Sequence, residues 1–366
     1  MALLDTPARR AMPVTAPGEL LDAFLALRRE ARLRHRDAAA RLGVSEGEAV
    51  AAAVAAPPPF SAVRLAPPWP RLFERVPSLG RVMALTRNEA VVHEKIGVYA
   101  DMSHRAGVGL ALGQDIDLRI FYVAWAHAFA VTEQAEDGTL QRSLQVFDAH
   151  GVAIHKVILR PGADLPAWER LVSDFAHPDQ EPGLQPEPAE PAPPPPDDAA
   201  VDVAAFQAAW LAMADTHEFF GLVRRFGLSR TQALRLAPAG HAESVSPGVL
   251  RILLESVAAE GLPIMVFVGN PGMIQIHTGP VQNIKVMGPW LNVLDPGFNL
   301  HLREDLVSRA WIVRKPTADG VVSSLELFDA AGETLVMVFG ERKPGRAELP
   351  AWRALLGALP REAIHG

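Results

Sequence analysis

The segment Trp210 to Arg225, WLAMADTHEFFGLVRR, contains a histidine that could bind a ligand. On a helix, His217 would share one face with Met213, Phe220 and Gly221, at the i−4, i+3 and i+4 positions. This face is apolar, and the glycine would let a flat ligand approach. A lone histidine in such a place is more often a core residue with satisfied ring nitrogens, so the spacing leaves both interpretations open.

Other kinds of catalytic or metal chemistry have little support in the sequence. No H-E-x-x-H, G-x-S-x-G, P-loop or G-x-G-x-x-G motif occurs in a suitable context, and His93-Glu94 lacks a second histidine at the required spacing. The twelve histidines are scattered, and cysteine is absent. The absence of cysteine excludes disulfides, thiolate ligands and covalent attachment through a C-x-x-C-H motif.

Charge and composition disfavour two classes of partner. The formal net charge of -7 argues against binding to nucleic acid, which depends on neutralising phosphates. A helix-turn-helix outline in HRDAAARLGVSEGEAVAAA carries Glu46 and Glu48 where a recognition helix would need basic or amide side chains. An early Asp and prolines interrupt the N-terminal stretch, and no run approaches the ~20 apolar residues of a membrane span. We expect a cytoplasmic protein without membrane insertion.

An internal duplication organises the whole chain. A shift of 182 positions aligns Met83 with Met265, and the alignment holds to Asp137-Gly138, which matches Asp319-Gly320. After a one-residue slip SLQVFDAHG matches SLELFDAAG, and an LPAW motif closes each half. Upstream, LGVSEGEAV matches FGLSRTQAL at an offset of 184, and both contain capping-box spacing for a helix start.

The repeat predicts an α+β fold used twice. Each half has a helical lead-in, then alternating segments rich in Val, Ile and Phe that predict a large antiparallel β-sheet, then a closing helix at the LPAW motif. We expect a first repeat over residues 15–177 and a second over 201–360. The intervening residues 178–200 are dense in Pro, Glu and Asp and predict a semi-stiff linker.

The two halves differ at positions that could bind an anionic ligand. The counterpart of His217 is Leu33, so the shared scaffold does not need the imidazole. Arg119 aligns with His301, and strand alternation places its neighbours on the opposite face, although a surface arginine is an equally plain interpretation. Lys315 aligns with Glu133, which gives the second half extra positive charge.

Six successive motifs carry a family resemblance. They are MALTRNEAVVHEKIGVY, LGQDIDLRIF, DTHEFFGLVRRFGLSRTQALRL, IMVFVGNPGMIQIHTGP, MGPWLNVLDPGFNLHL and WIVRKPTADGVVSSLELFD. In this order they resemble the hemin transport, or hemin-degrading factor, family of bacterial heme-uptake proteins. The resemblance covers nearly all of the chain outside the first 15 residues and the linker.

This resemblance implies one non-covalently bound heme b in a cleft between the repeats. The family histidine of D-x-H-x-F-F falls on His217, the proximal iron ligand, and the family arginine of D-L-R-x-F falls on Arg119, on the distal side with Phe121 nearby. The resemblance further assigns the propionates or their surroundings to basic residues, which fall here on Arg230, Lys315 and Arg342. This chain departs from the family pattern at two positions. It has Met337 and Phe339 where related members have polar Gln and Tyr.

The resemblance also implies a biological role. It predicts intracellular heme binding after uptake, for storage, for trafficking to a heme-degrading enzyme and for iron acquisition. The implied partners are a heme oxygenase and the cytoplasmic side of a heme ABC transporter. The alternative is an enzyme that itself cleaves heme with an electron donor, in which Arg119 would be the distal catalytic candidate. The residues leave the choice between carrier and enzyme open.

Overall fold

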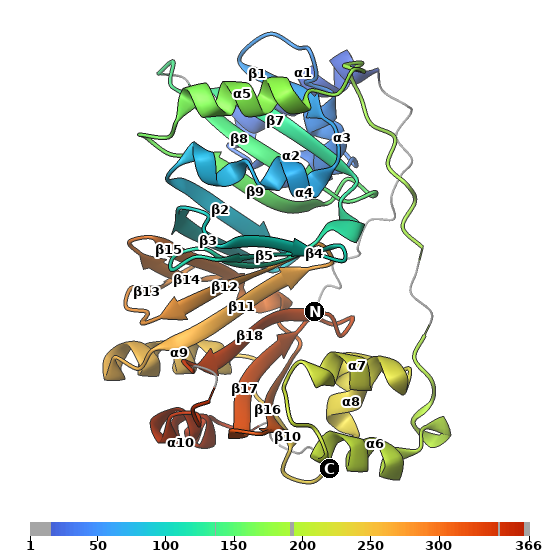
Figure 1. Ribbon diagram of the computed structural model, residues 1–366, viewed down its shortest axis with the longest axis vertical. Helices are drawn as coiled ribbons and strands as arrows, with labels where there is room; N and C mark the ends of the chain where they lie inside the picture. Colours follow the sequence, from blue (N-terminus) through green and yellow to red (C-terminus); the bar gives the residue numbers. More distant parts are fainter. Residues whose placement is uncertain (1–15, 136, 191–193, 343–344, 362–366) are drawn as a thin grey trace.

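The computed structural model describes residues 16–135, 137–190, 194–342 and 345–361. In this part of the chain two nine-stranded antiparallel sheets stack along the long axis of the molecule, with helices packed around them (Figure 1). The strand orders are β1-β7-β8-β9-β2-β3-β15-β14-β13 in sheet A and β10-β16-β17-β18-β11-β12-β6-β5-β4 in sheet B. This architecture confirms the predicted α+β duplication. Every helix of the described residues is too short or too polar to cross a lipid bilayer.

The elements of the two repeats follow in chain order. The first repeat contains α1 (Pro17–Ala31), α2 (His35–Arg41), α3 (Glu46–Ala51), β1 (Phe60–Leu65), α4 (Trp69–Phe73), η1 (Val76–Leu79), β2 (Val82–Arg87), β3 (Val91–Gly97), β4 (Met102–Arg105), β5 (Val108–Leu112), β6 (Asp117–Phe121), η2 (Tyr122–Ala124), β7 (His127–Gln134), β8 (Leu140–Phe147), β9 (Ala153–Leu159) and α5 (Leu165–Phe175). The second contains η3 (Asp198–Ala200), α6 (Val203–Leu211), α7 (Glu218–Arg225), α8 (Arg230–Arg235), β10 (Ala242–Val245), α9 (Val249–Glu260), β11 (Ile264–Asn270), β12 (Met273–Gly279), β13 (Ile284–Met287), β14 (Trp290–Asp295), β15 (Phe298–Arg303), η4 (Glu304–Leu306), β16 (Arg309–Thr317), β17 (Gly320–Phe328), β18 (Thr334–Gly340) and α10 (Pro350–Ala358).

The repeats exchange strands. Strands β4 to β6 of the first repeat extend sheet B, where β6 pairs with β12, and β13 to β15 of the second repeat extend sheet A, where β15 pairs with β3. Each sheet therefore combines strands from both halves of the sequence, an arrangement that the sequence analysis did not predict. The boundaries 15–177 and 201–360 remain a prediction about the repeats, and neither range forms a complete sheet alone.

The chain leaves sheet A at a glycine. At Gly97, the last residue of β3, a side chain would clash, since an added Cβ would lie 2.4 Å from the Cβ of Asp115. The equivalent residue of the second repeat is Gly279, the last residue of β12, whose φ of +135° favours glycine for a different reason. A glycine at both points lets each three-stranded segment cross to the other sheet.

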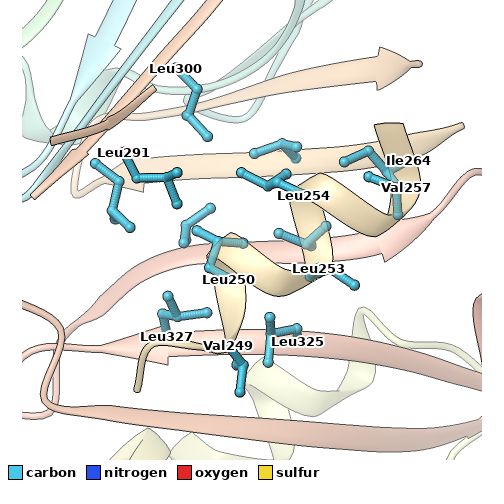
Figure 2. Packing of buried hydrophobic residues seen from close by; sticks show 14 of the residues in the cluster. Val249, Leu250, Leu253, Leu254, Val257, Ile264, Leu291, Leu300, Leu325 and Leu327 are labelled. Carbon is cyan, nitrogen blue, oxygen red and sulfur yellow. The ribbon is translucent and has the colours of Figure 1, made fainter. Parts of the chain in front are cut away.

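Helix α9 packs against strands of both sheets. Its apolar residues contact Leu291 and Leu300 of sheet A and Leu325 and Leu327 of sheet B, all of them buried (Figure 2). Burial of a leucine side chain stabilises the fold by about 1.5 to 3 kcal/mol. This cluster therefore joins the two sheets on the face of sheet B that lies away from α6 to α8.

The predicted helix starts are present. At α3, Ser45 and Glu48 form the complete capping box, in which each side chain accepts a hydrogen bond from the other residue's backbone N–H. At α8, Ser229 accepts from the Gln232 backbone at 3.1 Å, but the Gln232 amide instead donates to Pro196 and Asp198. The second capping box is therefore half formed. The Gln232 side chain instead attaches the segment before α6 to α8.

Part of the predicted linker is held against the first repeat. Gln180 exchanges hydrogen bonds with the backbone of Arg64, the Gly183 N–H donates to Ala51, and Leu184 packs on the α1 to α3 cluster. The composition predicts a semi-stiff linker but does not indicate these contacts, because they depend on backbone groups of residues remote in sequence. From there the described chain runs along one side of the molecule toward α6 (Figure 1).

Candidate functional site

One face of sheet B gathers most of the candidate residues. Cα partners in an antiparallel sheet place their side chains on the same face, and alternate residues of a strand share a face. The register Arg119↔Ile274, Ile274↔Gly269, Phe267↔Met337, Met337↔Glu326 and Val322↔Lys315 therefore traces a single face from β6 to β16. We call it the site face of sheet B.

The middle of the site face is apolar and partly exposed. Side chains of intermediate exposure from β11, β12 and β18 cover it, among them a Phe267–Phe339 pair with ring centroids 5.1 Å apart. At one end, α6 to α8 pack on Val313 and Phe328, and at the other end lies β6. An uncovered apolar stretch between two polar margins suits a flat apolar ligand. The apolar side chains of this stretch are Met265, Phe267, Ile274, Met337 and Phe339.

His217 lies outside the core. Helix α7 begins at Glu218 with His217 as its N-cap residue, and α6 ends at Leu211, so the continuous helix over 213–221 that the spacing suggested is wrong. The His217 side chain is 89 % exposed, which contradicts the interpretation as a satisfied core histidine. Phe220 is also exposed, and an added Cβ at Gly221 would meet no atom within 4 Å. The side of α7 that carries the histidine is open.

Asp215 orients the imidazole. Its Oδ1 accepts a hydrogen bond from the His217 backbone N–H at 2.8 Å and lies 2.6 Å from Nδ1 of the ring. The His217 backbone N–H, followed by its ring and the charge of Arg342, holds the pKa of the Asp215 carboxyl below its usual value. Because an ionised carboxylate only accepts hydrogen bonds, Nδ1 is the donor, and in the tautomer that this selects, Nε2 carries the lone pair that can bind a metal.

Arg119 lies on β6 as its strand alternation predicts. Its neighbours Leu118 and Ile120 are fully buried on the opposite face, and its own side chain is 32 % exposed. The guanidinium pairs with Asp117 on the same face, which fixes its direction. Phe121, two residues further, shares this face at intermediate exposure.

Arg230 and Lys315 share one buried carboxylate. Glu326, on β17, is fully buried and lies 2.8 Å from both cations. Burial would raise the pKa of the Glu326 carboxyl, but the charges of Arg230 and Lys315 outweigh it and lower the pKa well below its usual value. Both cations also lie over the Phe219 ring, at 5.1 and 4.5 Å from its centroid. This cluster attaches the start of α7 and α8 to the sheet.

The first repeat has a charge-reversed counterpart of this cluster. Glu46 is the first residue of α3, as Arg230 is of α8, and it pairs with Lys156 on β9, the counterpart of Met337. Glu133, the counterpart of Lys315, pairs with Arg28. A buried ion pair at this position is thus part of the duplicated scaffold. Of the predicted roles for Lys315, only the one in the ligand's surroundings fits its burial, since the residue is 3 % exposed.

Arg342 lies near the Asp215 and His217 pair. Its guanidinium is 3.8 Å from Asp319 and retains partial exposure, and its charge lowers the pKa of Asp215. The Ala318 N–H donates to the Ala214 carbonyl at 2.8 Å, which ties the loop before His217 to the turn between β16 and β17. Arg342 is therefore a cation at the margin of the site.

The two departures from the family pattern both lie on the site face. The Met337 sulfur accepts a hydrogen bond from Arg230 at 3.3 Å, and Phe339 packs on Phe267. The apolar side chains extend the hydrophobic surface where polar groups were expected. Asp215, Glu326 and Phe267 were not predicted as site residues from the sequence. For Asp215 the available signal was a carboxylate two residues before the histidine.

The fold and site define a class: a strand-exchanged α+β duplication with an exposed, carboxylate-oriented histidine beside an apolar sheet face. The chain belongs to the family of the haemin-degrading HemS.ChuX domain, whose model matches it twice, over residues 43–175 and 227–359. Both matches follow the repeats.

Curated relatives and solved structures agree with this assignment. The hemin transport protein HmuS of Yersinia pestis is 39% identical over 328 residues, which cover 88% of this chain and 92% of the relative. Holo-PhuS of Pseudomonas aeruginosa, a heme-binding protein, is 47% identical with a TM-score of 0.91, covering 95% of this chain and 100% of that one. ChuS of Escherichia coli O157:H7, a heme degrading enzyme, is 34% identical with a TM-score of 0.86, covering 94% and 99%.

Proposed function

We propose that this chain binds one heme b on the site face of sheet B, with His217 as the proximal iron ligand. The observation that carries this proposal is the exposed imidazole, which Asp215 orients at the edge of a partly exposed apolar sheet face. A neutral imidazole with a free Nε2 is an ordinary axial ligand of heme iron. The relatives described as hemin transport or heme-binding proteins support heme as the molecule that this chain binds.

The residues on this face fit the chemistry of a heme. The tetrapyrrole supplies iron and an extended apolar plane, and the side chains of Phe267, Ile274 and Phe339 offer an apolar surface of the kind that such a plane covers. Arg119 lies on β6, at the far end of the site face from α7, and we assign it the distal side together with Phe121. The absence of cysteine supports non-covalent binding.

The propionates need cations at the margin of this face. We assign them to Arg230 and Arg342, which are partly exposed, and we assign Lys315 to their surroundings, because its ammonium group is buried against Glu326. A cation that retains exposure can form charge-assisted hydrogen bonds with a carboxylate.

The proposed biological role extends the proposed heme binding. We propose a cytoplasmic carrier that holds heme after uptake and passes it to a heme oxygenase, after receiving it at the cytoplasmic side of a heme ABC transporter. The names of the curated relatives, hemin transport proteins, favour this role over heme cleavage by the chain itself.

Titration with hemin tests the proposal. The parent should form a one-to-one complex with a defined Soret band, whereas His217→Ala should shift the band and speed heme loss. His150→Ala is the matched control, because His150 lies on the first repeat and its ring Nδ1 is 2.8 Å from the Glu187 carbonyl oxygen. An unchanged spectrum and dissociation rate in His217→Ala would remove His217 as the ligand.

A second measurement separates carrier from enzyme. The complex is incubated with an electron donor in air, and the products are analysed for a ring-opened tetrapyrrole and released iron. A carrier leaves the heme intact. Stoichiometric ring opening would establish the enzyme instead, and Arg119→Ala would then test the distal arginine.

A further inference from the structure

In the loop before α7, one carboxylate oxygen of Asp215 accepts hydrogen bonds from both the backbone and the ring of His217. The Asp215 Oδ1 accepts from the His217 backbone N–H at 2.8 Å and from ring Nδ1 at 2.6 Å. The backbone bond fixes the carboxylate relative to the main chain, and the ring bond fixes the imidazole relative to the carboxylate. Rotation of the ring about its side-chain bonds would break the second contact.

We infer that Asp215 is a positioning residue that tunes the iron bound to His217. This inference rests on the proposed function, since it concerns the same ligand. A carboxylate that accepts the Nδ1 proton of a metal-bound histidine selects the tautomer, orients the ring and increases electron donation from Nε2. Greater donation stabilises the ferric over the ferrous state.

The setting of Asp215 supports a role beyond packing. The Asp215 side chain is 58 % exposed, so the fold gains little from its burial. The first repeat lacks the pair, because Leu33 stands at the position of His217 and Ala31 at that of Asp215. The shared scaffold therefore forms without either residue. Both occur together only in the repeat that carries the proposed iron ligand.

The neighbouring carboxylate Asp319 provides a matched control. It lies in the same part of the site, 3.8 Å from Arg342, and it contacts neither His217 nor Asp215 in the described hydrogen bonds. Asp215→Asn and Asp319→Asn remove the same charge. Only the first weakens the acceptor of the ring proton.

The experiment measures properties of the bound iron and of heme binding, and it does not depend on catalytic turnover. In the heme complex, Asp215→Asn should lower the iron–histidine stretching frequency of the ferrous form, make the reduction potential more positive and speed loss of ferric heme by about ten- to a hundredfold. Asp215→Glu should restore part of each change, and Asp319→Asn should change none of them. Thermal unfolding of the apoproteins should be alike.

Two results would overturn the inference. Asp215→Asn could leave the stretching frequency and the potential unchanged, or Asp319→Asn could shift both as much, which would indicate a general charge effect. A different result would overturn the proposed function itself. If His217 does not bind the iron, the heme spectrum of His217→Ala is unchanged from that of the parent. A parent protein in which His217→Ala loses ligation and Asp215→Asn changes nothing keeps the proposed function and rejects only the role of Asp215.

Discussion

The ammonium group of the buried Lys315 lies 2.8 Å from the Glu326 carboxylate and 4.5 Å from the centroid of the Phe219 ring. Phe219 follows His217 by two residues. The cluster therefore determines where α7 begins on the sheet, and through it where the imidazole lies. Lys315, a basic residue of the proposed heme site, thus positions α7 by contacting Glu326 and Phe219.

Lys315→Ala should weaken the binding of hemin and the binding of its dimethyl ester by the same factor. The ammonium group is buried, so its loss disturbs α7 without removing a contact to the propionates. Arg342→Ala should weaken hemin more than the ester, by roughly tenfold or less, as expected for a partly exposed charge pair. Dissociation constants for both ligands in the three proteins check this. A selective loss of hemin affinity in Lys315→Ala would place Lys315 at a propionate.

Glu326→Gln should destabilise the fold. The substitution leaves two cations without their buried partner, and breaking a buried ion pair in this way costs about 3 to 5 kcal/mol. Urea denaturation of the apoprotein measures the change. Glu243→Gln is the control, since Glu243 pairs with Arg314 and Arg361 at a more exposed position, where the loss should stay near 1 kcal/mol or below. An equal loss of unfolding free energy in both variants would show that the Glu326 cluster stabilises the fold no more than an exposed ion pair does.

Acid should destabilise the region between the two sheets. Burial lowers the pKa of His155 to about 3, and burial together with the charge of Lys95 lowers the pKa of His277 to about 3. Both rings stay neutral in the folded protein but become protonated on unfolding below about pH 6.5. Stability is therefore complete above pH 6.5 and falls toward pH 3, by up to about 1.4 kcal/mol per pH unit for each histidine.

Urea midpoints at pH 7.5 and 5.0 test this expectation. His155→Gln should be less stable at pH 7.5, because His155 hydrogen-bonds to Thr86 and Tyr99, but its stability should depend less on pH. His150→Ala, at a more exposed position, should retain the pH dependence of the parent. An identical pH dependence in all three proteins would show that these buried rings do not control acid stability.

Residues 1–177 and 201–366, expressed separately, should not form stable monomers with native heme affinity. Each sheet takes β4 to β6 or β13 to β15 from the other half, so an isolated half exposes an unpaired strand edge. Because β6 and β15 are equivalent, two copies of one half can reproduce the exchange. We expect dimers by light scattering, and weak hemin binding. A monomer with full affinity would show that the exchange is dispensable.

The sequence determined the local structure and the repeat. The constant offset revealed the duplication, Ser45 and Glu48 located the start of α3, and apolar alternation along the strands was enough to place Leu118 and Ile120 opposite Arg119. These features depend on residues close together in the chain, where spacing specifies backbone hydrogen bonds and the exposed face.

Only the tertiary structure decided which copy of each strand pairs with which sheet. The edges of β3 and β12 are equivalent, so the sequence does not distinguish pairing within a repeat from pairing between repeats. Exposure of His217 likewise depends on the break between α6, which ends at Leu211, and α7, which begins at Glu218. Burial of Lys315 depends on Glu326 from a neighbouring strand. Each outcome is set by contacts between segments remote in sequence, which local spacing does not encode.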